Sequence, residues 1–209
     1  MNIIAHRGLW STGLGANSLG ALKEAIDLNF GIETDIRDYE GKLVISHDIA
    51  NEDSPSLDNF FELYKDCNKE TVLALNVKAD GIQNLLIQAI KAYDISNYFL
   101  FDMSIPEMVV YRAKELNFFT RNSDIEQECV LYDDAQGVWV DKFFSSWNIY
   151  DAIINHIKNG KKVSLISPEI HGEERTELWE VIKNSDLVNE QNFYLCTDLP
   201  LEARVFFGE

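Results

Sequence analysis

Hydrophobic and polar positions alternate along this chain with two different periods. Short apolar runs rich in β-branched and aromatic residues are typical of strands, whereas longer stretches repeat apolar residues every three to four positions, as amphipathic helices do. The predicted strands cover 2–8, 31–37, 42–46, 71–78, 98–104, 118–123, 137–143, 161–167 and 192–198. The predicted helices cover 17–29, 56–66, 82–94, 105–116, 149–160 and 175–184, and a turn at 38–41 joins the second and third strands.

The order of these elements predicts an α/β fold. Strands that alternate with helices favour a parallel sheet with helices outside it. The count approaches eight strand and helix units without a linker, which favours a single domain over residues 1–209 and closure into a compact (β/α)8 TIM barrel. A doubly wound open sheet is the competing topology, but no GxGxxG turn follows the first strand. Either topology places the chemistry at the carboxyl ends of the strands.

Composition and charge narrow the choice of partners and compartment. The chain has 18 Lys and Arg against 35 Asp and Glu, a formal charge of -17, so we expect neither a nucleic-acid partner nor stable membrane association. Its three cysteines are far apart and form no CxxC, which favours a reducing compartment. With no leader pattern and no long apolar run, a cytoplasmic protein is expected. The sequence leaves the oligomeric state open.

Polar side chains stand near the carboxyl ends of several predicted strands. Because side chains alternate across a strand, Glu33 and Asp35 share one face, as do Asn76 and Lys78. We therefore expect oxygen ligands and histidines from several strands to converge. The strand-end residues are His6, Arg7, Glu33, Asp35, Asn76, Lys78, Asp141, Glu169, His171, Thr197 and Asp198.

Four stretches resemble a known family. "AHRG", "ANSLGALKEAID", "GIETDIRDYEGKLVISHD" and the closing "CTDLP" are similar, in order and spacing, to motifs of the glycerophosphodiester phosphodiesterases. The resemblance implies a TIM barrel of the phospholipase-C-like phosphodiesterase type. It also implies hydrolysis of a small-molecule phosphodiester, a glycerophosphodiester or a related compound, to an alcohol and a phosphomonoester.

The resemblance implies roles for two histidines and two cations. His6 and His47 correspond to the general acid and base, a task that suits imidazole because it titrates near neutral pH. Arg7 and Lys78 would bind the phosphate oxygens. His6, Arg7 and His47 lie in the matched motifs, and Lys78 follows "NV" at the end of the predicted strand 71–78.

A divalent cation, Mg²⁺ or Ca²⁺, is the implied cofactor. Glu33 and Asp35 correspond to ligands of this cation, which would neutralise charge on the phosphate. The family's third acidic ligand is replaced here by Asn76, whose amide oxygen can coordinate the metal but carries no negative charge. Asp141 and Glu169 are candidates for the missing carboxylate.

The substrate pocket has four further candidate residues. Trp10 follows the first predicted strand closely enough to flank the substrate, and the other three come from later strand ends. The complete set of possible pocket residues is Trp10, Asp141, Glu169 and His171.

Two alternative functions remain open at this point. One is a catalytically impaired barrel that binds a phosphorylated ligand, motivated by Asn76, although both histidines are retained. The other is a Schiff-base lyase with Lys78 as its nucleophile, which would leave the two histidines and the acidic pair without a common purpose.

Overall fold

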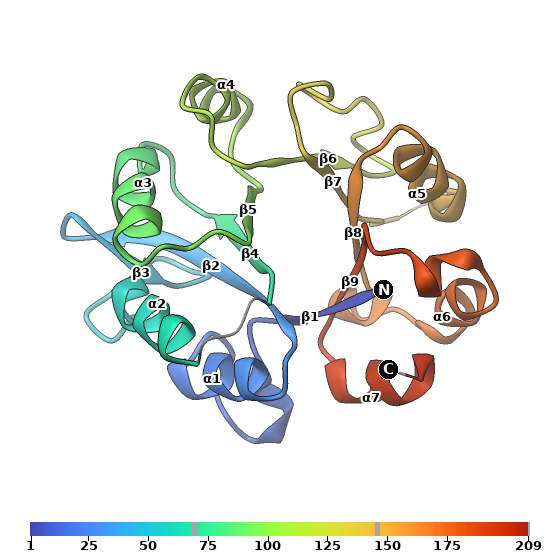
Figure 1. Ribbon diagram of the computed structural model, residues 1–209, viewed down its shortest axis with the longest axis horizontal. Helices are drawn as coiled ribbons and strands as arrows, with labels where there is room; N and C mark the ends of the chain where they lie inside the picture. Colours follow the sequence, from blue (N-terminus) through green and yellow to red (C-terminus); the bar gives the residue numbers. More distant parts are fainter. Residues whose placement is uncertain (68–70, 145–146, 209) are drawn as a thin grey trace. The chain divides into compact units, whose positions relative to one another are not determined.

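The structure is a computed structural model that describes residues 1–67, 71–144 and 147–208 (Figure 1). The chain divides into two compact units. Ala5–Phe118 form the N-terminal unit, and Met1–Ile4 with Phe119–Glu209 form the C-terminal unit. Strand β1, Asn2–His6, begins in the C-terminal unit and ends in the N-terminal unit. The assignment of residues 1–209 to a single domain stays a prediction.

The N-terminal unit alternates strands and helices in the predicted way. In its sheet β2 pairs with β4 and β4 with β5, both in parallel, while β3 pairs antiparallel with β2. Helices α1 and α2 lie side by side (Figure 1). The strands are β2 Gly31–Tyr39, β3 Lys42–Ile45, β4 Leu73–Val77 and β5 Tyr98–Phe101. The helices are α1 Leu19–Asp27, α2 Leu57–Asp66, α3 Gln83–Ala92 and α4 Ile105–Ala113, with a short 3-10 helix η1 at Trp10–Thr12.

Local sequence signals explain the boundaries of these elements. Ser18 caps α1, since its hydroxyl accepts a hydrogen bond from the Ala21 amide. The β2–β3 hairpin turns at Glu40 and Gly41, which both have positive φ angles of 50° and 76°, as two-residue hairpin turns require.

Strand β2 is longer than predicted. Its parallel pairing with β4 stops at Ile36, and the strand then continues to Tyr39 against β3. Glu33 and Asp35 therefore lie within β2, near the end of its parallel segment, rather than at the end of the strand.

The C-terminal unit repeats the same strand and helix pattern. Its parallel strands are hydrogen-bonded in the order β6, β7, β8, β9, and α5 packs against β7 and β8. The strands are β6 Phe119–Asn122, β7 Gly137–Val140, β8 Lys162–Ile166 and β9 Phe193–Thr197. The helices are α5 Ile149–Lys158, α6 Thr176–Lys183 and α7 Pro200–Phe207, with 3-10 helices η2 Pro168–His171 and η3 Asp186–Asn189. Helix α7 was not predicted from the sequence.

The strands of both units are buried and apolar, as parallel strands covered by helices should be. In the N-terminal unit Leu73 and Leu75 of β4 are fully buried, as is Phe60 of α2. In the C-terminal unit Leu165 of β8 and Trp179 of α6 have almost no exposed surface. Burial of each such side chain stabilises the fold by about 1.5–3 kcal/mol.

Candidate active site

A sharp turn after β1 places the first candidate residues. Arg7 and Gly8 both have left-handed backbones, with φ angles of 56° and 82°. A Cβ atom on Gly8 would lie 2.7 Å from the carbonyl carbon of Ala21, so only glycine fits here without a backbone shift. The turn directs the Arg7 amide to Glu33, where it donates to the backbone oxygen at 2.9 Å and to the side-chain Oε2 at 3.2 Å.

Asp35 lies at the centre of a polar cluster in the N-terminal unit. It is 1% exposed, and its Oδ2 accepts a hydrogen bond of 2.8 Å from Asn17 Nδ2 and lies 3.2 Å from Arg7 Nε. Its Oδ1 lies 3.5 Å from Lys78 Nζ, which lies at the same distance from Asp102 Oδ2. The structure thus brings both predicted phosphate-binding cations to one carboxylate.

Glu33 is the most strongly perturbed acid of this cluster. It is 1% exposed, and its loss of hydration, followed by repulsion from Asp35, raises its pKa to about 7. His6, Lys78 and Arg7 act in the opposite direction but do not cancel these effects. Perturbation of this size is typical of functional sites, although buried ion pairs also produce it.

The predicted metal ligands offer the kind of oxygen atoms that a divalent cation binds. Asp35 and Asn76 are opposite one another in the register of β2 and β4. Asp35 Oδ1 and Asn76 Oδ1 are buried and have no hydrogen-bond partner among the described residues. Buried acceptors of this kind cost free energy unless something satisfies them, and hard oxygen atoms are the ligands that Mg²⁺ and Ca²⁺ prefer. Within the described ranges no three His, Cys, Asp or Glu side chains form a metal-binding group, so the set depends on the Asn76 amide.

Both candidate histidines lie in the N-terminal unit. His6 ends β1, and its Nε2 lies 3.8 Å from Glu33 Oε2. Trp10 donates its indole N–H to the His6 carbonyl at 3.1 Å, which fixes Trp10 beside the turn. His47 is half exposed, and its Nδ1 lies 2.9 Å from Asp48 Oδ1, a hydrogen bond that lowers the pKa of Asp48. An Nδ1–H held in this way leaves Nε2 of His47 available for proton transfer.

A cavity of about 360 Å³ adjoins this cluster. Arg7 and His47, predicted to bind phosphate and to transfer protons, both line it together with Asn17 and Asp48. Most of its other lining residues are polar, and most come from the segment between β3 and α2, with Ala16 and Ser18 from just before α1. The arrangement can therefore admit a small polar molecule beside both residues.

Two residues of the cluster escaped the sequence analysis. Asn17, the first residue of the predicted helix 17–29, links Asp35 to Thr34, whose hydroxyl donates to Asn17 Oδ1 at 2.8 Å. Its φ of 61° is a conformation that asparagine tolerates well. An asparagine at the start of a helix was therefore a sequence signal for a special backbone position. Asp102 directly follows β5, and the rule that chemistry gathers at strand ends would have found it.

The remaining predicted pocket residues lie in the C-terminal unit. His171 Nε2 is 2.8 Å from Asp141 Oδ1, and burial raises the pKa of Asp141 while His171 lowers it. Glu169 accepts hydrogen bonds from the hydroxyls of Ser167 and Thr197, so both of its oxygens are already engaged. That Asp141, Glu169 and His171 line the substrate pocket stays a prediction.

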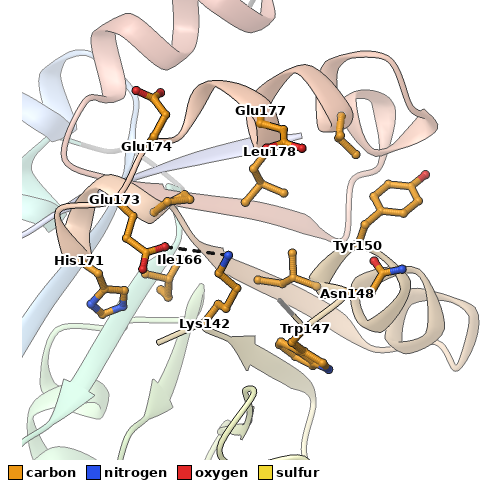
Figure 2. Close-up of a pocket in the computed structure, with 13 residues that line it drawn as sticks. Lys142, Trp147, Asn148, Tyr150, Ile166, His171, Glu173, Glu174, Glu177 and Leu178 are labelled. Atoms are coloured by element: carbon orange, nitrogen blue, oxygen red, sulfur yellow. Dashed lines mark ion pairs between the residues drawn. The ribbon is translucent and has the colours of Figure 1, made fainter. Parts of the chain in front are cut away.

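The C-terminal unit has a cavity of its own, of about 390 Å³ (Figure 2). Figure 2 shows His171 on one side of it and Tyr150 on the other, with Lys142 between them. Lys142 Nζ lies 4.0 Å from Glu173 Oε2. This cavity mixes apolar and charged side chains at the ends of β7 and β8.

The fold is that of solved phosphodiesterases. The chain matches no protein-family model and no curated protein sequence. Among solved structures it is similar to a candidate glycerophosphodiester phosphodiesterase of Galdieria sulphuraria, with a TM-score of 0.79 and 18% identity over 100% of this chain and 98% of that one. A glycerophosphodiester phosphodiesterase of Agrobacterium tumefaciens gives 0.71 and 16%, over 99% and 98% of the two chains. An Oleispira antarctica phosphodiesterase, in complex with the product sn-glycerol-3-phosphate, gives 0.72 and 16%, over 100% and 97%.

These likenesses confirm the predicted fold class, a (β/α)8 TIM barrel. At identities of this size they establish the fold only, so the chemistry must be argued from the residues of the site. Among the described residues, no helix combines the length and apolar character needed to span a membrane.

Proposed function

We propose that this chain is a metal-dependent phosphodiester hydrolase that acts on glycerophosphodiesters or related small phosphodiesters. One observation carries the proposal: two cations, Arg7 and Lys78, lie beside the buried carboxylate of Asp35 in the N-terminal unit. Two buried oxygens, Asp35 Oδ1 and Asn76 Oδ1, have no hydrogen-bond partner among the described residues. A cavity lined by Arg7 and His47 adjoins this group. Phosphoryl transfer requires these components, because it depends on positioning and charge neutralisation.

His6 and His47 carry the proton transfers of the proposed reaction. One imidazole accepts a proton from water while the water oxygen forms a bond to phosphorus. The other donates a proton to the bridging oxygen as the bond between phosphorus and that oxygen breaks, which releases an alcohol and a phosphomonoester. Asp48, hydrogen-bonded to Nδ1 of His47, fixes the orientation of that ring.

Arg7 and Lys78 hold the phosphate in the proposed site. Guanidinium has five N–H donors, so the contact of Arg7 Nε with Asp35 leaves donors for phosphate oxygens. Glu33, Asp35 and Asn76 would hold the divalent cation, Mg²⁺ or Ca²⁺. When bound, that cation neutralises negative charge on a phosphoryl oxygen.

The surroundings of Lys78 weigh against a Schiff-base lyase. Its Nζ lies 3.5 Å from carboxylate oxygens of both Asp35 and Asp102, an arrangement of an ion-paired ammonium group. A Schiff-base nucleophile must attack as the neutral amine.

Two further features support the substrate class and compartment that we propose. The Oleispira antarctica structure contains sn-glycerol-3-phosphate, a phosphomonoester product, and supports glycerophosphodiesters as substrates here. Among the described residues Cys67, Cys129 and Cys196 form no disulfide, which supports the proposed cytoplasmic location.

The test is turnover of bis(p-nitrophenyl) phosphate and of glycerophosphodiesters by the purified protein, with EDTA and then with Mg²⁺ or Ca²⁺. We expect activity only with the metal, and a loss of about 10²–10⁴-fold in kcat for His6→Ala and for His47→Ala, because each removes a proton-transfer group. Lys42→Ala, an exposed change in the same unit, is the control and should leave kcat unchanged. Turnover that survives both EDTA and His6→Ala would refute the proposal. Binding of a phosphodiester without turnover would favour the impaired barrel instead.

A further inference from the structure

Asp102 occupies an unusual position at the edge of the candidate metal site. Asp35 in β2 pairs with Asn76 in β4, and Asn76 pairs with Phe101 in β5. Asp102 therefore lies one residue beyond this row, at the carboxyl end of the strand next to Asn76. Its backbone is left-handed, with a φ of 69°, a conformation that aspartate adopts more readily than most residues other than glycine.

Lys78 connects Asp102 to the metal-binding carboxylate. Its Nζ lies 3.5 Å from Asp35 Oδ1 and 3.5 Å from Asp102 Oδ2. The Lys78 and Asp102 side chains are 20% and 22% exposed, whereas that of Asp35 is 1% exposed. In this partly buried setting an opposite charge at such distances matters more than on an open surface.

The oxygen that Lys78 approaches is one that a cation would use. Asp35 Oδ1, like Asn76 Oδ1, has no hydrogen-bond partner in the part of the chain that the structure describes. An ammonium group that stays close to Asp35 Oδ1 repels a divalent cation from the same oxygen. A second carboxylate beside Lys78 gives that ammonium an alternative partner.

We propose that Asp102 supplies the negative charge that Asn76 lacks, by holding Lys78 so that Asp35 Oδ1 is available to the divalent cation. This inference rests on the proposed metal-dependent function. Asp102 is a positioning residue in this account: its charge acts on the cation through Lys78, while Glu33, Asp35 and Asn76 provide the ligand atoms.

The first experiment measures metal binding and does not depend on activity. EDTA-treated, dialysed protein is titrated calorimetrically with Mg²⁺ and, separately, with Ca²⁺. Asp102→Asn should weaken binding by about tenfold or more, because one nearby charge is lost. Asp102→Glu should retain most of the affinity. Asp94→Asn is the matched control, since Asp94 is an exposed aspartate with a similar φ of 55°, and it should bind as the wild type does.

Two double variants test the proposed route. Asn76→Asp, which places a carboxylate in the row itself, should restore the affinity lost in Asp102→Asn. In a Lys78→Met background Asp102→Asn should cost much less than in the wild type, because the ammonium group that it positions is gone. Thermal unfolding of each variant shows whether it is folded.

The outcomes separate this inference from the proposed function. Wild-type protein that binds the metal, together with Asp102→Asn protein that binds equally well, would overturn the role of Asp102 and leave the hydrolase intact. An undiminished cost in the Lys78→Met background would overturn the route through Lys78. Wild-type protein that binds neither ion would overturn both proposals.

Discussion

Glu33 should make the stability of the metal-free protein fall as the pH rises from about 4.5 to 7. Burial, followed by repulsion from Asp35, raises its pKa from the ordinary 4.5 to about 7. Below this interval the carboxyl group is protonated in both the folded and the unfolded chain. Within it, the unfolded chain releases the proton while the folded chain retains it, so the free energy of unfolding decreases.

The magnitude follows from the difference between the two pKa values. One pKa unit corresponds to about 1.4 kcal/mol, so this group should lower the free energy of unfolding by about 3 kcal/mol across the interval. Above pH 7 both states are ionised and the contribution becomes constant. Glu33→Gln removes the titrating carboxyl group. It keeps an oxygen that can accept a hydrogen bond from the Arg7 amide, which donates to Glu33 Oε2 at 3.2 Å.

The assay is urea unfolding of the wild type and Glu33→Gln, in EDTA, at half-unit steps from pH 4.5 to 8. The variant should gain about 3 kcal/mol relative to the wild type between pH 4.5 and 7. Glu52→Gln, at an exposed carboxylate, is the control and should run parallel to the wild type. A difference between wild type and Glu33→Gln that stays constant with pH would refute the reasoning. Added Mg²⁺ or Ca²⁺ should stabilise the wild type most above pH 7, where the metal no longer competes with the proton.

Two stability predictions test the turn and the polar cluster. Gly8→Ala should lower the free energy of unfolding in urea more than Gly13→Ala does. Both glycines have a left-handed backbone, whose strain in alanine costs about 1–3 kcal/mol. Only at Gly8 would the added Cβ also clash with the backbone of α1. Equal costs would show that the close approach is unimportant. Asn17→Ala should destabilise by about 1–3 kcal/mol more than Asn29→Ala, since both residues have positive φ but Asn17 also donates a hydrogen bond to buried Asp35. A cost no greater than that of Asn29→Ala would contradict the bridging role.

The sequence was sufficient for most of the fold because its apolar periods reflect burial directly. The strand and helix order and the 31–46 hairpin followed from periodicity and turn residues. Helix α7 was missed although its signals are present, with Pro200 in its first turn and Gly208 as its left-handed cap. The length of β2 was underestimated because its last residues pair with β3, and this pairing produces no hydrophobic period in the sequence.

The candidate site was predictable in its members but not in its contacts. The motifs identified Arg7, Glu33 and Asp35, and the end of the strand 71–78 identified Lys78; the structure brings all four together in one unit. That Lys78 lies between Asp35 and Asp102 depends on three neighbouring strands, and residue spacing within one strand does not reveal it. The resemblance drew attention to Asn76 as a weakened ligand, but the carboxylate next to it in space came from a strand with no family motif.

From the charges of the cluster, and from a formal charge of -17, we expect this chain to require a cation to bind the proposed phosphodiester substrate. Arg7 and Lys78 are within ion-pair distance of Asp35, and Lys78 also contacts Asp102. With Glu33 ionised, three carboxylates outweigh two cations, so the metal-free cluster repels an anionic phosphodiester. A divalent cation reverses the sign of this balance. It also favours the ionised form of Glu33, so substrate binding and the titration of Glu33 should depend on the same metal.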